Sequence, residues 1–176
     1  MSNTVDYGSI TESATGEVLH VDGGFITSTI DTEATSIFRN IRIALENRLT
    51  TLTDLSNIAF ENVEIDLSTL DKGANGVEFV QAFLLPQATE SLEISPTGRD
   101  LHEGIFQINY YNGVGIGGYS TKLDYIAQAF KRGTELNFSG TTVRVRNVSL
   151  GVGRREDAFF VRNIDVSYYA VTPARS

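Results

Sequence analysis

Two stretches near the end of the sequence alternate apolar and polar residues, and this alternation limits the folds open to the chain. In "TTVRVRNVSL", Val143 and Val145 alternate with Arg144 and Arg146. Residues 160–170 repeat the pattern, and the side chains expected to face inward there are Ile164, Val166 and Tyr168. A period of two indicates strands with one buried and one solvated face, which is typical of antiparallel sheets.

Further segments have the character of strands. Residues 58–65 are a short candidate, and residues 77–85 are nearly all apolar and end at Pro86. Residues 91–94 and 103–111 are expected to pair as a hairpin. The hairpin residues expected to share one face are Phe106, Ile108 and Tyr110.

Two segments have the period of amphipathic helices. Asp31 or Thr32 is a possible N-cap of the first, and Ser120 or Thr121 of the second. Gly133 stands where a left-handed helix end is expected. The first stripe consists of Ile37, Ile41, Ala44, Leu45, Arg48, Leu49 and Leu52. The second consists of Leu123, Ile126, Ala127 and Phe130.

Together these segments predict an α+β domain over residues 31–176, a mostly antiparallel β-sheet with two α-helices packed on one face. A chain of 176 residues with 41% hydrophobic residues is long enough to bury one core, and without cysteine it forms no disulfides. The first residues lack the basic region and apolar run of a signal peptide, so we expect a soluble protein made in a cytoplasm.

Residues 1–30 are expected to form a separate segment, an extended N-terminal arm. They are rich in Ser, Thr and Gly and can bury little apolar surface by themselves. Short alternating segments of this kind can add a strand to an exposed sheet edge on another chain, so we expect the arm to be ordered only against a neighbour. Its candidate anchors are Val18, Leu19, Val21, Phe25 and Ile26.

Charge is unevenly distributed along the chain, whose net charge is −8. Residues 1–38 contain six acidic residues and no Lys or Arg, whereas residues 131–162 contain seven of the 14 basic residues. The pattern indicates an acidic arm and a domain with a basic flank, or simply two solvated surfaces. If the flank is an interface, its candidate residues are Arg144 and Arg146 on an exposed sheet face and Arg154 and Arg155 at a hairpin tip.

The segment 113–118 matches the dinucleotide-binding pattern G-x-G-x-x-G through Gly113, Gly115 and Gly118. In a dinucleotide-binding unit the strand after the helix is parallel and buried, and it reads as a continuous apolar run. Here Arg144 and Arg146 interrupt that strand. We therefore interpret the glycines as a mobile connector, and keep a small-ligand-binding enzyme only as an alternative.

Catalytic patterns are absent from the sequence, which predicts no enzyme, no cofactor and no metal. His20 and His102 stand far apart without a second ligand at a metal-binding spacing. Glu61, Glu64 and Asp66 cluster near one expected strand, where solvated charge is the simpler interpretation.

Three quoted stretches resemble one protein family. They are "FEN" at 60–62 after the helix "IRIALENRL", "FVQAFLLPQAT" at 79–89, and "GIFQINYYNGVGIGGYSTKLDYIAQAFKRGTEL" at 104–136. In this order and spacing they are similar to the tail terminators of tailed bacteriophages, the lambda tail-terminator-like proteins. The resemblance covers about residues 35–169. The family commonly has proline where this chain has Lys131, and the arm lies outside its pattern.

The resemblance implies a structural virion protein. Such proteins form a hexameric ring on the last ring of the tail tube, stop its growth and present a surface to the head or neck. The implied partners are other copies of this chain, the tail tube protein and a neck or head-completion protein, with genomic DNA passing through the ring without sequence-specific binding. A head-completion or neck (connector) protein is the alternative from the same virion context. The implied location is the head–tail junction of the virion, after assembly in the host cytoplasm.

Overall fold

The computed structural model divides the chain into two compact units, Met1–Ile37 and Phe38–Ser176. In the first unit, β1 (Val18–Val21) and β2 (Gly24–Thr27) form an antiparallel hairpin. The structure describes residues 18–21, 24–27, 37–55, 57–61, 63, 65–66, 68, 72–73, 76–95, 97–113 and 121–173.

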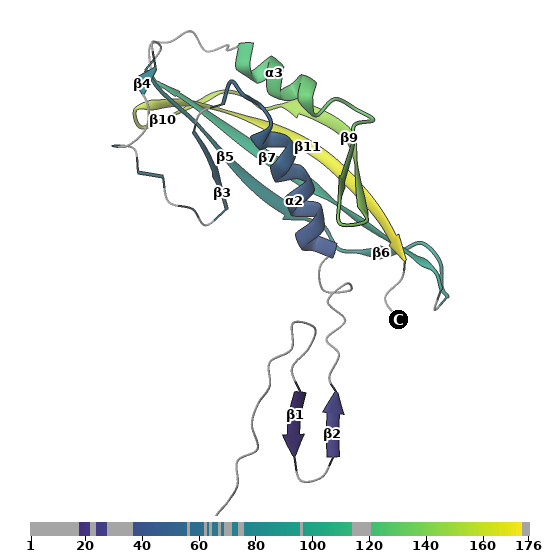
Figure 1. The fold of residues 1–176 in the computed structure, drawn as a ribbon. Coiled ribbons are helices and arrows are strands. Elements are labelled where there is room, and N and C mark those ends of the chain that lie inside the picture. Colours follow the sequence, from purple (N-terminus) through teal and green to yellow (C-terminus); the bar gives the residue numbers. More distant parts are fainter. Residues whose placement is uncertain are drawn as a thin grey trace, which may run out of the picture. The chain divides into compact units, whose positions relative to one another are not determined.

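The second unit contains one sheet and two helices, which confirms the expected α+β class (Figure 1). The helices are α2 (Ile37–Thr50) and α3 (Thr121–Ala129). The strands are β3 (Ile58–Phe60), β4 (Lys72–Gly73), β5 (Gly76–Pro86), β6 (Glu90–Ser91), β7 (Arg99–Gly113), β8 (Glu135–Phe138), β9 (Thr141–Leu150), β10 (Arg154–Glu156) and β11 (Phe159–Pro173).

The strand order across the sheet is β3-β5-β7-β11-β9-β8, with β4, β6 and β10 as short additions. The long central pairs are antiparallel, as expected; β7 and β11 pair along their whole length, from Arg99↔Pro173 to Gly113↔Phe159. One pair departs from the expectation, because β3 runs parallel to β5. Residues 58–65 were expected to form one strand, but β3 ends at Phe60, where the chain turns.

One face of the sheet forms the core, and the alternation of the sequence predicts it correctly. Val143 and Val145 are buried on β9, whereas Arg144 and Arg146 are exposed. The inward residues of β7 and β11 are likewise buried: Phe106, Ile108, Tyr110, Ile164, Val166 and Tyr168. The residues between them on β11 are half-buried rather than fully solvated.

Both helices bury the stripe expected from the sequence, with three differences: Arg48 and Ala127 are half-buried, and Ala129 is buried. The Phe38 ring of α2 meets His102 edge-on at 5.4 Å, and Phe130, just after α3, lies 6.0 Å from Phe106. His102 and Phe106 share one face of β7, because residues four apart in a strand point the same way.

Polar contacts connect the helices with other parts of the fold. Asn40 donates to the Thr141 hydroxyl over 3.2 Å, and Arg48 donates from Nε to the carbonyl of Ala129 over 3.1 Å. Gly133 has a φ of +84°, which confirms the left-handed position expected after the second helix. The N-caps Asp31, Thr32 and Ser120 lie outside the described residues.

The strand connections around α3 differ from those of a dinucleotide-binding unit. β7 and β9 are both antiparallel to β11, so they run in the same direction, and β8 is antiparallel to β9. The strand that directly follows α3 is therefore antiparallel to β7 and three places away in the sheet. Gly113 ends β7, and Gly115 and Gly118 lie outside the described residues.

Candidate interface surfaces

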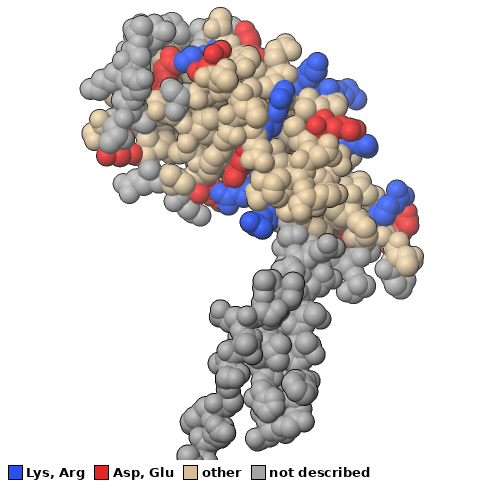
Figure 2. Space-filling view, in the orientation of Figure 1, with Lys and Arg blue, Asp and Glu red and all other residues tan. Residues whose placement is uncertain are grey.

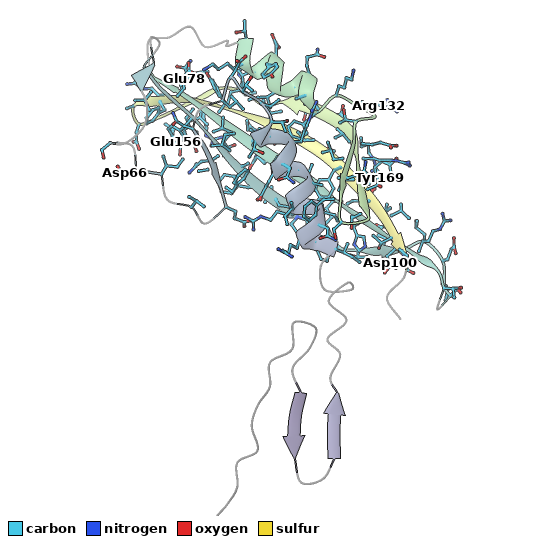
Figure 3. The ribbon with its side chains drawn as sticks, viewed as in Figure 1. Asp66, Glu78, Asp100, Arg132, Glu156 and Tyr169 are labelled. Atoms are coloured by element: carbon cyan, nitrogen blue, oxygen red, sulfur yellow. The ribbon has the colours of Figure 1, made fainter. Side chains whose placement is uncertain are left out.

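The four candidate arginines form two separate pairs instead of one flank. Arg144 is in register with Tyr169 and Arg154 with Val161, both on β11. Val161 and Tyr169 are eight positions apart along β11, which is roughly 26 Å at about 3.3 Å per residue. Tyr169 and Glu156, which neighbours Arg154, lie toward different ends of the sheet in Figure 3.

The first pair lies within a charged network on the outward face. Arg144 donates from Nε to Glu135 over 2.9 Å, and Arg146 forms an ion pair with Glu103. The Arg146 guanidinium also lies over the Tyr169 ring, 5.3 Å from its centre. Hydrogen bonding to Tyr169 raises the pKa of Arg144, and the nearby Glu135 carboxylate raises it further.

The second pair lies on a strand, and the expectation of a hairpin tip is wrong. Arg154 and Arg155 belong to β10, in register with Val161 and Phe160 of β11. The tip that follows is made by Asp157, which has a φ of +50°, and Ala158. Short aspartate side chains tolerate this left-handed conformation better than arginine does, so the turn forms one residue beyond β10. Arg154 lies 3.4 Å from Glu156.

Charges of both signs alternate over the visible face of the molecule. Figure 2 shows lysine and arginine in small groups beside aspartate and glutamate rather than in one basic field. Each of the exposed pairs contributes about 0.2–1 kcal/mol in isolation. The arrangement therefore suits contacts that depend on the placement of several charges, more than attraction by one strong field.

The expected anchors of the arm all fall in the β1–β2 hairpin. Val18, Leu19 and Val21 belong to β1, and Phe25 and Ile26 belong to β2. Leu19 is paired with Ile26 in the register.

An aromatic cluster on the outward sheet face was not predicted from the sequence. Phe79 stacks on Tyr111 with ring centres 4.3 Å apart, and Phe159 meets Phe79 edge-on at 5.1 Å. Burial raises the pKa of the Tyr111 hydroxyl, and the nearby Glu156 carboxylate raises it further. The three residues come from β5, β7 and β11, and only the cross-strand register brings them together.

Polar side chains occupy the middle of the same face. Gln107 and Asn163 both donate to the carboxylate of Asp165, over 3.3 Å and 3.2 Å. The alternation of β11 predicted that Asn163 and Asp165 face outward, but the partner Gln107 lies on β7, 58 residues away.

Among the described residues, two pairs of exposed apolar side chains lie close together in the sequence. Leu92 and Ile94, in the turn between β6 and β7, are 47% and 107% exposed. Leu150 and Val152, at the end of β9 and just after it, are 42% and 89% exposed. A strand-period pattern predicts that apolar residues are buried, so the sequence does not indicate that these side chains are exposed.

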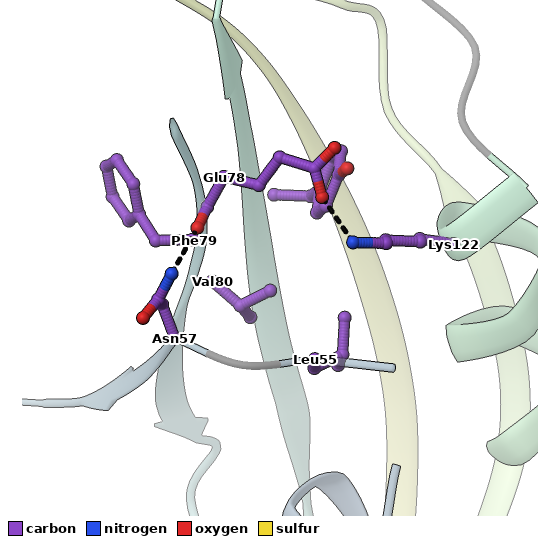
Figure 4. Close-up of a pocket in the computed structure, with 7 residues that line it drawn as sticks. Leu55, Asn57, Glu78, Phe79, Val80 and Lys122 are labelled. Atoms are coloured by element: carbon purple, nitrogen blue, oxygen red, sulfur yellow. Dashed lines mark hydrogen bonds and ion pairs between the residues drawn. The ribbon is translucent and has the colours of Figure 1, made fainter. Parts of the chain in front are cut away.

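A small pocket lies between β5 and α3 and contains an ion pair (Figure 4). Lys122 of α3 pairs with Glu78 of β5, and Asn57 donates to the Glu78 carbonyl over 2.8 Å. The remaining lining residues are Leu55, Phe79, Val80 and Tyr110. These contacts tie α3 to the sheet, which is a structural role.

Three of the residues considered for metal or acid–base chemistry, namely His102, Asp66 and Glu61, have structural partners. His102 is buried between the hydroxyls of Thr89 at 3.0 Å and Thr172 at 2.8 Å. Asp66 accepts two hydrogen bonds from Ser68, which lower its pKa, and Glu61 lies 4.0 Å from Arg42. In the described ranges, no group of three or more His, Cys, Asp or Glu residues could hold a metal ion. The side chain of His20, and Glu64 altogether, lie outside what the structure describes. Neither described helix is long and apolar enough to cross a membrane.

Comparison with known proteins identifies the family. No curated protein matches the chain. Nine chains of solved structure do, and one of them is 26% identical with a TM-score of 0.57, over 77% of this chain and 96% of that chain. The sequence model of the family described as phage tail terminator protein matches residues 40–168, which run from α2 to β11. This match confirms the resemblance seen in the sequence, and the chain belongs to the phage tail terminator protein family.

Proposed function

We propose that this protein forms a hexameric ring that caps the tail tube of a tailed phage and joins it to the head or neck. The observation that carries the proposal is the family match over residues 40–168, which gives the chain a structural role in a phage tail. Ring formation, tail capping and the neighbouring proteins in the virion are proposed.

The distribution of exposed side chains supports a ring. A closed ring of identical subunits uses heterologous contacts, in which one patch meets a different patch of the next copy. The apolar group at Leu92 and Ile94 lies near the end of β11, since the Leu92 amide donates to the carbonyl of Arg99, which pairs with Pro173. The group at Leu150 and Val152 lies near Ile164, nine residues further back along β11, or roughly 30 Å. Two patches so far apart suit contacts with two different neighbours.

The ring would have three kinds of partner besides its own copies. The tail tube protein lies on one side, a neck or head-completion protein lies on the other, and genomic DNA passes through without sequence-specific binding. Charges of both signs on the outward sheet face suit such passage, because a strongly basic face would hold DNA through its phosphates. The protein would act at the head–tail junction of the virion.

Native mass spectrometry of the purified protein tests the ring. The proposal predicts particles of six subunits of 19.3 kDa each. A stable monomer whose melting temperature rises on addition of a nucleotide or another small ligand would instead favour an enzyme that uses the segment 113–118. A ring found on the capsid side of an imaged virion would favour the head-completion or neck protein.

A further inference from the structure

The two edges of the large sheet differ in how they are protected. At the β5 edge, the strand runs past its short neighbour β3 and ends at Pro86, which offers no N–H to an incoming strand. At the other edge, β8 covers only Thr141–Arg144 of β9, and the turn before β8 bonds to Val145. Further along β9, the residues Asn147–Leu150 pair with β11 on one side, and no other described strand pairs with them on the other side.

The open part of β9 lacks the features that normally protect an edge. The stretch "NVSLGVG" at 147–153 contains neither a charge nor a proline, and Leu150 and Val152 are exposed within it. Charged residues, prolines and covering segments are the usual devices that keep an edge from pairing with another chain. Arg144 and Arg146 precede the open edge, and Arg154 and Arg155 follow it. The edge is thus an uncharged strip between two pairs of arginines.

The β1–β2 hairpin has complementary properties. It is a sheet of two strands with four residues each, and an isolated two-stranded hairpin is at best marginally stable in water. A third strand would add the missing backbone hydrogen bonds. Glu17 stands directly before β1 and Asp22 directly after it, in a segment of 38 residues that has six acidic side chains and no basic one.

We propose that the β1–β2 hairpin of one copy adds to the open edge Asn147–Leu150 of β9 in a neighbouring copy, and so extends its sheet. Backbone hydrogen bonds provide the attachment, as in other cases of strand addition. The acidic residues beside β1 meet the arginines beside the edge, which favours this edge over the one that ends at Pro86. The inference rests on the proposed assembly of several copies and names the surfaces that connect them.

The absence of cysteine from the chain allows a direct test by disulfide cross-linking. One preparation carries Ser149→Cys on the open edge, and a second, of different mass through a tag, carries Leu19→Cys or Ile26→Cys in the hairpin. The two are mixed, oxidised and separated by mass, so a mixed disulfide can form only between copies. The matched control replaces Ser149→Cys with Leu85→Cys, at an exposed position on the edge that ends at Pro86.

The proposal predicts a mixed disulfide between Ser149→Cys and one of the two hairpin variants. The Leu85→Cys control should give a yield of mixed disulfide roughly tenfold lower, because Pro86 limits strand pairing at that edge. The yield should also fall as salt is added, since salt screens the arginine–carboxylate attraction. Equal yields at both edges, or none at the open edge, would overturn the inference.

Hydrogen exchange gives a second measurement without substitutions. The amides of Asn147–Leu150 should become more protected as the protein concentration, and with it assembly, increases. Unchanged exchange in these residues would also contradict the proposal. If rings form but neither the mixed disulfide nor the amide protection is observed, only this inference is wrong and the proposed function is unaffected. If the purified protein forms no rings, the proposed function itself is wrong.

Discussion

The guanidinium of Arg146 on β9 forms an ion pair with the carboxylate of Glu103 on β7, although β11 lies between the two strands. Tyr169 of β11 is paired with Glu103 in the register, and Arg146 lies over its ring at 5.3 Å. A β-bulge makes this contact possible: Ser167 pairs with Asn147 and Tyr168 with Val145, so Arg146 is the extra residue. Bulges re-aim a side chain in this way.

Replacement of Arg146 should therefore destabilise the subunit measurably, although the side chain is 55% exposed. Arg146→Ala removes both the ion pair and the contact with Tyr169, and together these should cost about 1 kcal/mol of the free energy of unfolding. Urea denaturation measures the change. Arg144→Ala is the comparison variant, with a smaller loss, because Arg144 contacts only the two strands next to its own, through Glu135 on β8 and Tyr169 on β11, and does not reach across β11 to β7. An equal loss in the two variants would contradict the bridging role.

Charge reversal on β10 should affect assembly more than folding. Arg154 and Arg155 are exposed, and Arg154 forms an ion pair with Glu156 at 3.4 Å. The double variant Arg154→Glu/Arg155→Glu should therefore change the melting temperature little, while reducing the fraction of protein in rings and the yield of mature virions. The variant Arg154→Lys/Arg155→Lys keeps the charge and should assemble normally. A clear drop in melting temperature with normal assembly would show that these arginines are internal structural partners.

Substitution of Gly104 should be among the most damaging changes in the sheet. A Cβ at this position would lie 2.5 Å from the Tyr168 hydroxyl and 2.7 Å from the Leu85 carbonyl oxygen, both too close for any contact. Gly104→Ala should therefore destabilise the subunit more than Gly133→Ala, which meets open space and costs about 1–2 kcal/mol through its left-handed backbone alone. Thermal unfolding of the two variants measures which substitution lowers the stability more. A smaller loss for Gly104→Ala would mean that β5 and β11 can separate easily there.

Stability should fall at high pH through Tyr168. Burial raises the pKa of its hydroxyl from 10.0 to about 12, so the folded state favours the neutral phenol. This contribution is fully present below pH 10, the unfolded value, and is lost as the pH rises toward 12; two pKa units correspond to about 2.7 kcal/mol. Unfolding measured at pH 9 and pH 12 should show a smaller pH-dependent loss in Tyr168→Phe than in the wild type. The same loss in both would assign the effect to other groups.

Local pattern was enough to predict the main strands and the core. Val143, Val145 and Ile164 alternate with polar neighbours, and the side of a strand on which a residue lies follows from that period alone. Both helices were likewise predicted from their apolar stripes. These features depend on neighbours within a few residues, which the sequence shows directly.

Strand order and long-range contacts were beyond the sequence. Nothing in the local pattern places β11 between β7 and β9. The distance between Arg144 and Arg154 therefore could not be predicted, and neither could the ion pair of Arg146 with Glu103. β8 was missed because "ELNF" is too short to show a period, and its place in the sheet comes from pairing with β9. The open edge at Asn147–Leu150 depends on where β8 ends, which is also a tertiary property.

Imaging of labelled virions tests the central claim most directly. The protein is given a tag that binds a gold particle, incorporated into phage particles and located by electron microscopy. The proposed ring predicts label at the head-proximal end of the tail tube on mature virions, and at the same end of tails that have not yet joined a head. Label along the tube, at the distal tip, or only on tail-free heads would contradict a tail-capping role.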